Sequence, residues 1–200
     1  MRVITLNELS KEEVRTLRKL LEWPGIYVHI RKPLITEVAF GRYLSQFSEA
    51  DRPRLITHQH YAIALDNGVA HMHLPAHARA GLPGASPGVY ASTSTHGWDE
   101  FNQLGTAFRS AFIGPVFPSI SKPGYGTHQQ LAFTGRTNFA MQAIALGGIS
   151  AENIGALSGA HFDDVALCGA IWQARDPLQE AARCYQLLQV NHRSSKHDIQ

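Results

Sequence analysis

Two glycine-containing segments in the C-terminal part of the chain could bind a phosphate group. An apolar run that starts at Ala143 ends in Gly147 and Gly148, and a second run ends in Cys168 and Gly169. Backbone N–H groups converge where a strand passes into a helix, and glycine lets a ligand approach the main chain closely. The two segments therefore predict paired phosphate-binding loops.

Imidazole, cationic and hydroxyl side chains follow the other apolar runs. They are His29, Arg31 and Lys32; His58, Gln59 and His60; Ser94 and His96; and Ser119, Ser121 and Lys122. Imidazole titrates near neutral pH and can transfer a proton, and cations bind anions. Because almost no carboxylate joins this set, we predict an anionic and phosphorylated substrate.

A (β/α)8 barrel (α/β class) would bring these residues together, because functional groups of that fold lie past the C-terminal ends of its strands. Apolar runs alternate with amphipathic segments, which is typical of parallel βα units. We expect strands at residues 3–6, 26–30, 55–57, 72–74, 89–92 and 111–114 and at the two glycine-containing segments. We expect helices at residues 10–23, 36–47, 61–66, 98–108, 128–139 and 177–190, and one after Gly148, with the fourth crossover reduced over 76–88.

We expect a single barrel domain over residues 1–190 and a flexible tail over 191–200. The chain has 200 residues, of which 44% are hydrophobic, enough for a sizeable core. A formal charge of +2 without a basic stripe argues against a nucleic-acid partner. No signal-peptide core or membrane-spanning run is visible, so we expect a cytoplasmic protein without a membrane partner. Cys168 and Cys184 lack CxxC spacing and are expected to be reduced.

A series of motifs in this order resembles the thiamine-phosphate synthase and TenI (thiazole tautomerase) family. The motifs are HIRKP (29–33), THQH (57–60), HMHL (71–74), STHGWDE (94–100), GPVFPSISK (114–122), ALGGI (145–149) and VALCGAI (165–171). The resemblance covers nearly the whole chain. It implies a TIM barrel in thiamine biosynthesis that binds a thiazole phosphate, with a pyrimidine diphosphate as second substrate in the synthases.

The resemblance also implies roles for single residues. It makes Gly147, Gly148, Cys168 and Gly169 the binders of the thiazole phosphate. It places Ser119, Ser121 and Lys122 in a diphosphate-binding loop, matches Arg31 and Ser94 to family binding residues, and puts His29 in place of a glutamine. The lysine of that strand-two motif is either displaced to Lys32 or lost.

The chain departs from both branches of that family. The synthases hold Mg²⁺ with an Asn-Asp pair after strand three and an Asp five residues beyond the strand-four histidine, where this chain has His58, Gln59 and Ala78. Mg²⁺ prefers carboxylate oxygens. The catalytic histidine of the tautomerases falls at Pro115. We therefore expect no metal or cofactor, with Mg²⁺ required only if the chain is a synthase.

We favour metal-independent proton transfer of the tautomerase kind. His58 or His60 would be the acid and base, with His96 next, and Arg31 and Lys122 would hold the anion. Thiamine-phosphate synthase is the first alternative, and a non-catalytic barrel that binds phosphorylated ligands is the second. A third is a transition-metal hydrolase, whose ligands would be His58, His60, His71, His73 and His77. The sequence leaves open whether the chain forms a homodimer.

Overall fold

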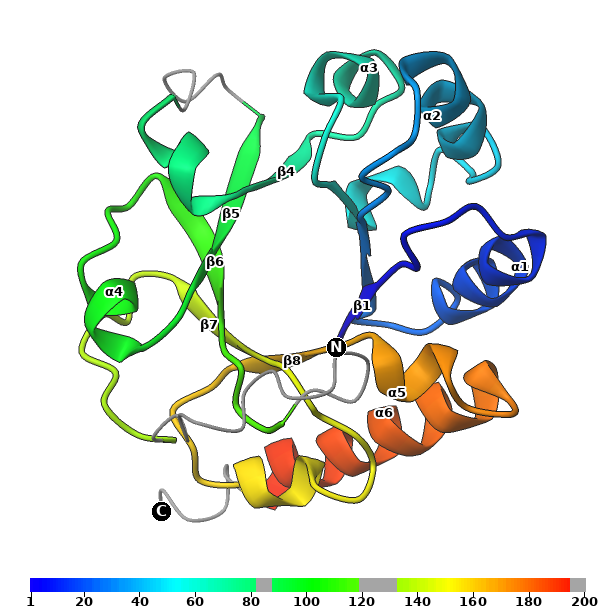
Figure 1. The fold of residues 1–200 in the computed structure, drawn as a ribbon. Coiled ribbons are helices and arrows are strands. Elements are labelled where there is room, and N and C mark those ends of the chain that lie inside the picture. The colour runs from blue at the N-terminus through cyan, green and yellow to red at the C-terminus, as the bar shows by residue number, and fades with distance from the viewer. Residues whose placement is uncertain (82–87, 119–132, 195–200) are drawn as a thin grey trace.

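The computed structural model describes residues 1–81, 88–118 and 133–194, and in them the chain forms a closed parallel barrel (Figure 1). The strands follow one another around the barrel in chain order, and β8 closes it against β1. They are β1 (Arg2–Ile4), β2 (Tyr27–Ile30), β3 (Leu55–Thr57), β4 (His71–Leu74), β5 (Tyr90–Thr95), β6 (Phe108–Ile113), β7 (Gln142–Leu146) and β8 (Asp164–Leu167). The predicted (β/α)8 barrel is confirmed.

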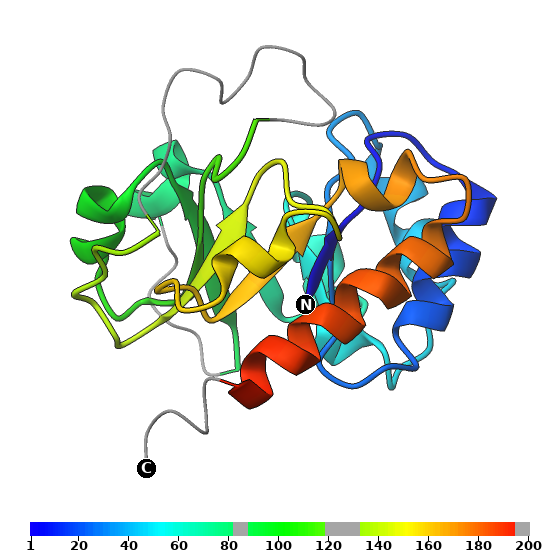
Figure 2. The same cartoon turned by 90° about the horizontal axis from the view of Figure 1, so that it is seen from below.

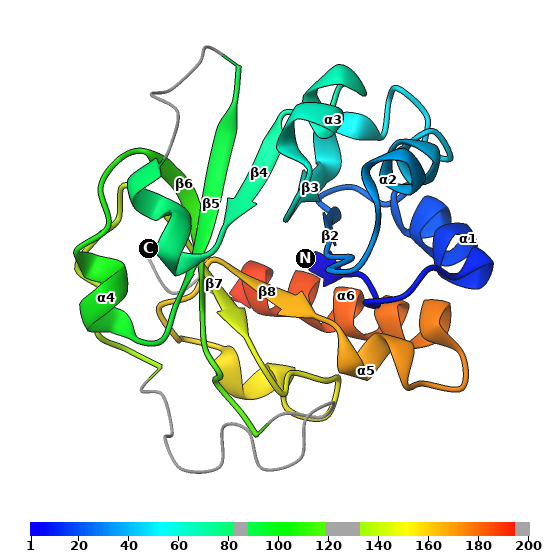
Figure 3. The ribbon, with the colours of Figure 1, turned by 45° about the horizontal axis from the view of Figure 1, so that its top comes forward.

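Regular helices cover the first half of the barrel. α1 (Lys11–Leu20), α2 (Glu37–Leu44) and α3 (Tyr61–Asp66) follow one another outside β1 to β4, with η1 (Arg52–Arg54) between the last two (Figure 3). The hydroxyl of Ser10 accepts from the Glu13 N–H and that of Thr36 from the Ala39 N–H, both at 3.3 Å. These caps satisfy N–H groups that the first helical turn leaves unpaired, which explains where both helices begin.

The core lies mainly between these helices and the strands. Val28 and Ile30 of β2 are fully buried, as are Leu17 and Leu20 of α1 and Phe40 of α2. A buried parallel strand presents apolar side chains to both faces, whereas an amphipathic helix presents one. This apolar layer fixes the first half of the barrel and the loops that leave its strands.

Between β5 and β8 the described segments hold shorter helices than the sequence predicts. α4 (Trp98–Asn102) ends well before the predicted residue 108, because β6 already begins at Phe108. The described part of the predicted helix 128–139, residues 133–139, is irregular, and 128–132 lie outside the described residues. The segment after β7 holds only turns and η3 (Ile154–Leu157) instead of a regular helix. The reduced fourth crossover is confirmed, as η2 (Ala76–Gly81).

The last two helices complete the barrel wall. α5 (Gly169–Trp172) is a single turn, and α6 (Pro177–Ser194) runs beside α1 and α5 (Figure 2). α6 extends to Ser194, into the predicted tail, and residues 195–200 lie outside the described residues. No helix in the described ranges is long and apolar enough to cross a bilayer.

Candidate functional site

The loops after β7 and β8 leave the barrel side by side. β7 pairs with β8 in parallel, with Leu146 opposite Ala166, so both loops start at the same end. Gly147 and Gly148 have φ angles of +103° and +64°, a region that side chains other than glycine rarely adopt. A Cβ on Gly147 would lie 2.7 Å from Pro115 Cβ, and one on Gly148 would overlap the carbonyl oxygen of Pro118. Close packing against the loop after β6 therefore requires both glycines, and phosphate binding there stays a prediction.

The loop after β8 is tied to β1 by a hydrogen bond. Cys168 precedes the single turn of α5, and the Trp172 Nε1–H donates to the Ile4 carbonyl at 2.7 Å. Cys168 and Gly169 are both half-buried. The loop is thus anchored to β1, and Cys168 and Gly169 remain partly accessible at the C-terminal end of the barrel.

Three histidines from successive strands form a hydrogen-bonded cluster at the centre of the barrel. Nδ1 of His29 on β2 lies 3.1 Å from Nε2 of His58, which follows β3. The ring of His73 on β4 stacks on that of His58, with centroids 4.3 Å apart. Nδ1 and Nε2 of His73 lie 2.9 Å from the hydroxyls of Ser92 and Ser94. We call His29, His58 and His73 the imidazole cluster.

The imidazole cluster is neutral near pH 7. Burial, together with the nearby guanidinium of Arg79, lowers the pKa of His73 to about 3. Burial is also the main cause that lowers the pKa of His29 and of His58 well below the usual value, with neighbouring imidazoles adding to it. Nδ1 of His58 makes no hydrogen bond within the described ranges, so it can accept a proton from a ligand.

The two cations after β2 have different environments. Arg31 is exposed, and its Nη1 donates to Asn7 Oδ1 at 2.6 Å. Lys32 is fully buried, and its Nζ lies 2.5 Å from Glu13 Oε2 and donates to the Leu6 carbonyl at 2.7 Å. The prediction that Lys32 binds an anionic ligand is wrong, because its ammonium group is enclosed and already paired. Arg31 can still bind such a ligand.

The other predicted acid–base residues lie apart from the imidazole cluster. His60 has a left-handed backbone, with φ of 52°, and its Nε2 lies 2.7 Å from the Ile35 carbonyl, beside α2. His96 is exposed. The amide of Gln59 donates to the Lys32 carbonyl at 3.1 Å. Of the histidines predicted to be catalytic, the structure brings only His58 into the cluster, among the described residues.

Sequence reasoning missed three charged residues near this end of the barrel. Arg79 of η2 donates Nε to Thr93 Oγ1 at 2.9 Å and also donates to the Ser94 carbonyl. Its Nη1 pairs with Glu100 Oε1 at 2.7 Å. Glu13 is the other addition, so the expectation of almost no carboxylate near the site is corrected. The spacing of residues in an irregular segment gave no signal for Arg79.

The predicted ligands of a metal hydrolase are only partly together. Ring nitrogens of His29, His58 and His73 all lie within 4.8 Å of one another, whereas His60 turns to α2 and His71 packs against Tyr90. No acidic residue of the described ranges joins this group. Three neutral imidazoles suit a transition metal rather than Mg²⁺, which prefers hard oxygen ligands. The residues at the synthase metal positions therefore do not fit Mg²⁺.

Ser119, Ser121 and Lys122 lie outside the described residues. Their predicted role in binding the anion therefore stays a prediction.

A closed eight-stranded parallel barrel with polar groups at the C-terminal ends of its strands defines the class of (β/α)8 barrel proteins. A family model described as thiamine monophosphate synthase matches residues 3–171, so the chain belongs to the thiamine monophosphate synthase and TenI family. The family predicted from the sequence is confirmed.

Individual relatives agree with this assignment. The chain is 30% identical over 94 residues to thiamine-phosphate synthase of Methylobacillus flagellatus, covering 44% of this chain and 45% of the relative. It is 35% identical over 79 residues to the synthase of Thioalkalivibrio sulfidiphilus, covering 39% and 37%. The matched segments thus span less than half of these relatives. The crystal structure of thiamine phosphate pyrophosphorylase from Bacteroides thetaiotaomicron has the same fold, with a TM-score of 0.75 at 18% identity over 95% of this chain and 98% of that one.

Proposed function

We propose that the chain binds a thiazole phosphate and isomerises it by proton transfer without a metal ion. The observation that carries this proposal is the imidazole cluster, in which His58 stands after β3 at a position where the family resemblance implies a Mg²⁺ ligand of the synthases. His58 presents a neutral ring nitrogen there, and neutral imidazole is a general base suited to neutral pH. The isomerisation moves one proton between two positions of the same ligand, so it needs a base that returns the proton.

In this proposal Nδ1 of His58 takes the proton from the ligand. The Nε2–H of His58 keeps its hydrogen and donates a hydrogen bond to Nδ1 of His29, 3.1 Å away, which stabilises the imidazolium that forms. His73 stacks on one face of the His58 ring and is itself held by Ser92 and Ser94. This contact restricts the orientation of the His58 ring. Return of the proton from Nδ1 to the second ligand position completes the isomerisation.

Charge on the ligand offsets the low proton affinity of the buried ring. Burial disfavours imidazolium in the free protein, whereas a phosphate or carboxylate close to His58 stabilises it. Arg31 is exposed on the same side and binds the ligand anion, and the loops after β7 and β8 hold the phosphate. Binding of the anionic ligand therefore raises the proton affinity of His58.

Thiamine-phosphate synthase is the second candidate. The curated relatives carry that name, and the cations Arg31 and Arg79 could neutralise a diphosphate in place of a metal. Against it, Arg79 is already paired with Glu100, and His58, Gln59 and Ala78 replace the metal ligands that the resemblance implies.

Two parallel assays separate the candidates. With EDTA and a thiazole phosphate tautomer as substrate, proton NMR should show isomerisation, and His58→Gln should lower kcat by about 10²- to 10⁴-fold. His77→Gln, which removes an exposed imidazole outside the cluster, is the matched control and should keep the rate. Formation of thiamine phosphate from both synthase substrates, without isomerisation, would establish the second candidate. Tight thiazole phosphate binding without either reaction would leave the chain a binding protein.

A further inference from the structure

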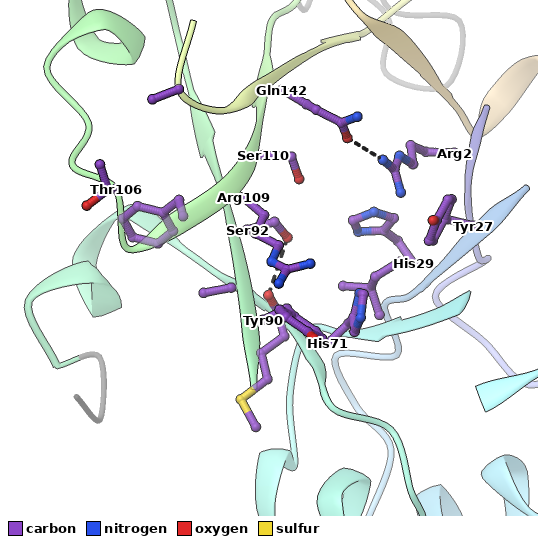
Figure 4. A pocket seen from close by; sticks show the side chains of 15 residues that line it. Arg2, Tyr27, His29, His71, Tyr90, Ser92, Thr106, Arg109, Ser110 and Gln142 are labelled. Atoms are coloured by element: carbon purple, nitrogen blue, oxygen red, sulfur yellow. Dashed lines mark hydrogen bonds between the residues drawn. The ribbon is translucent and has the colours of Figure 1, made fainter. Parts of the chain in front are cut away.

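A polar cavity of about 390 Å³ opens at the N-terminal ends of the strands, opposite the loops that carry the candidate site (Figure 4). Its polar walls include residues at or near the starts of six strands: Arg2, Tyr27, His71, Tyr90, Arg109 and Gln142. Its volume is that of a pocket for a small molecule. Neither the family resemblance nor the proposed function gives this end of the barrel a role.

Arg109 provides one cation of this cavity. Its guanidinium lies over the Tyr90 ring, with Cζ 3.4 Å from the centroid. Within the described ranges no carboxylate lies within ion-pair distance of it, although the side chain is at a strand start where its neighbours are fixed. Stacking holds a guanidinium by its face and leaves the N–H groups around its edge available to an anion.

Arg2 provides the second cation. It is only 9% exposed, and its Cζ lies 4.0 Å from the centroid of the Tyr27 ring. Its Nη2 donates to Gln142 Oε1 at 2.9 Å. Its Nε lies 3.3 Å from Asp164 Oδ2 but makes no well-formed hydrogen bond. Arg2 is thus a buried guanidinium whose donors are incompletely used, and it points into the cavity (Figure 4).

His71 lies with the two arginines. Its ring meets the Tyr90 ring edge-on at 4.7 Å between centroids. Burial lowers the pKa of His71, and the charges of Arg109 and Arg2 lower it further, so both guanidinium groups act on one point in the cavity. The described residues that line the cavity include no carboxylate. Asp164, which pairs with Arg2, is outside this lining. The electrostatic potential in the cavity is therefore positive.

We propose that this cavity binds the phosphate group of a small molecule, with Arg109 and Arg2 as its donors. Two guanidinium groups held by aromatic rings match the geometry of a phosphate better than that of a single-charge anion. The cavity reaches the inner side of the imidazole cluster, because His29 and Ser92 also line it, but Arg2 and Arg109 take no part in the proposed thiazole phosphate site. The cavity is a second ligand site at the end of the barrel that usually serves stability.

NMR titration of the whole chain tests this proposal, with inorganic phosphate in one series and phenyl phosphate in the other. The probes are the Nε–H signals of Arg2 and Arg109 and the ring signals of His71. We expect saturable shifts in these signals, and an affinity at least about tenfold lower in Arg109→Gln. Preference for phenyl phosphate indicates an organic phosphate as ligand, and preference for inorganic phosphate indicates the free ion; either supports the site.

Matched variants separate this site from charge effects and from the candidate site. Arg15→Gln removes the same charge from a side chain that is 75% exposed, and Arg31→Gln alters the proposed thiazole phosphate site. Both should leave the shifts at Arg2, Arg109 and His71 unchanged. Arg109 is exposed, so Arg109→Gln should fold, which thermal unfolding checks. Equal affinity of wild type and Arg109→Gln, or shifts confined to the Arg31 end, would overturn the proposal whatever the outcome for thiazole phosphate.

Discussion

The two ends of the barrel use polar residues in opposite ways. At the C-terminal end the imidazole cluster is buried, hydrogen-bonded and neutral, and the cation Lys32 is enclosed by Glu13. At the N-terminal end Arg2 and Arg109 stack on tyrosines, and Arg109 has no acidic partner in the described ranges. The first arrangement suits proton transfer, because neutral imidazole accepts protons. The second suits anion binding.

Strand β4 shows how one short segment serves both ends. His71 and His73 are two residues apart, so their side chains leave the strand on the same side but about 7 Å apart along it. His73 joins His58, Ser92 and Ser94, whereas His71 lines the N-terminal cavity. Spacing in a strand therefore predicts the face that a histidine shares but not the end of the barrel that it serves.

The largest effect is expected where a predicted ligand-binding residue proved to be structural. Lys32→Met should lower the free energy of unfolding by about 3–5 kcal/mol, because it leaves the buried carboxylate of Glu13 unpaired. Burial already raises the pKa of Glu13, so part of the loss should be recovered below the pH at which that carboxyl is protonated. Urea denaturation at several pH values measures both. A loss below 1 kcal/mol would contradict the assignment of Lys32 as a buried ion-pair partner.

The neighbouring cation should behave in the opposite way. Arg31→Gln should weaken binding of thiazole phosphate by about 10- to 100-fold, because a charge-assisted hydrogen bond is lost. Its side chain is exposed and, within the described residues, hydrogen-bonds to Asn7, so stability should change by less than about 0.5 kcal/mol. Calorimetric titration together with urea denaturation checks the contrast. Unchanged affinity would remove Arg31 from the site.

The two histidines of β4 provide a matched pair. His73→Gln should cost about 1–3 kcal/mol of stability, because the hydroxyls of Ser92 and Ser94 lose their buried partner. His71→Gln removes a half-buried ring with no hydrogen bond within the described ranges and should cost less than about 1 kcal/mol. Thermal unfolding of both variants measures the difference, and equal losses would mean that the serine contacts are not made.

The pH dependence of stability is shared among the three rings of the imidazole cluster. Above about pH 6.5 the cluster imidazoles are neutral in the folded and the unfolded chain, so they contribute no pH dependence. Below it the unfolded chain binds protons that the folded chain does not, because the folded-state pKa values are lowered, for His73 to about 3. The free energy of unfolding should therefore decrease as the pH decreases, by up to about 1.4 kcal/mol per pH unit for each imidazole. Urea denaturation from pH 7.5 to 5 measures this slope, and His73→Gln should reduce it.

Much of the barrel could be predicted from the sequence, because strand patterns and helix caps are local signals. Leu55–Thr57 and Tyr61–Asp66 have the predicted bounds, and Ser10 caps its helix as expected. The segments between β5 and β8 were predicted less well, since apolar periodicity over residues 98–108 continues into β6 without marking where α4 ends, whereas α6 begins at the predicted Pro177. Tertiary packing decides that boundary.

The candidate site was less predictable than the fold. The strand ends indicated His29, His58 and Ser94 because each follows or belongs to an apolar run. The pairing of Lys32 with Glu13 depends on a contact between the loop after β2 and α1, and the contact of Arg79 with Ser94 depends on the path of η2. Neither has a spacing rule, because they join segments distant in sequence. Burial, not residue type, distinguishes Arg31 from Lys32.

The protonation state of the imidazole cluster is the central claim, and nitrogen NMR of the histidine rings tests it most directly. We predict that the rings of His29, His58 and His73 stay neutral in the free chain from about pH 8 to about pH 5.5, and that thiazole phosphate shifts the signal of His58 toward imidazolium. Titration of all three rings near pH 6.5, with no response of His58 to the ligand, would contradict the account.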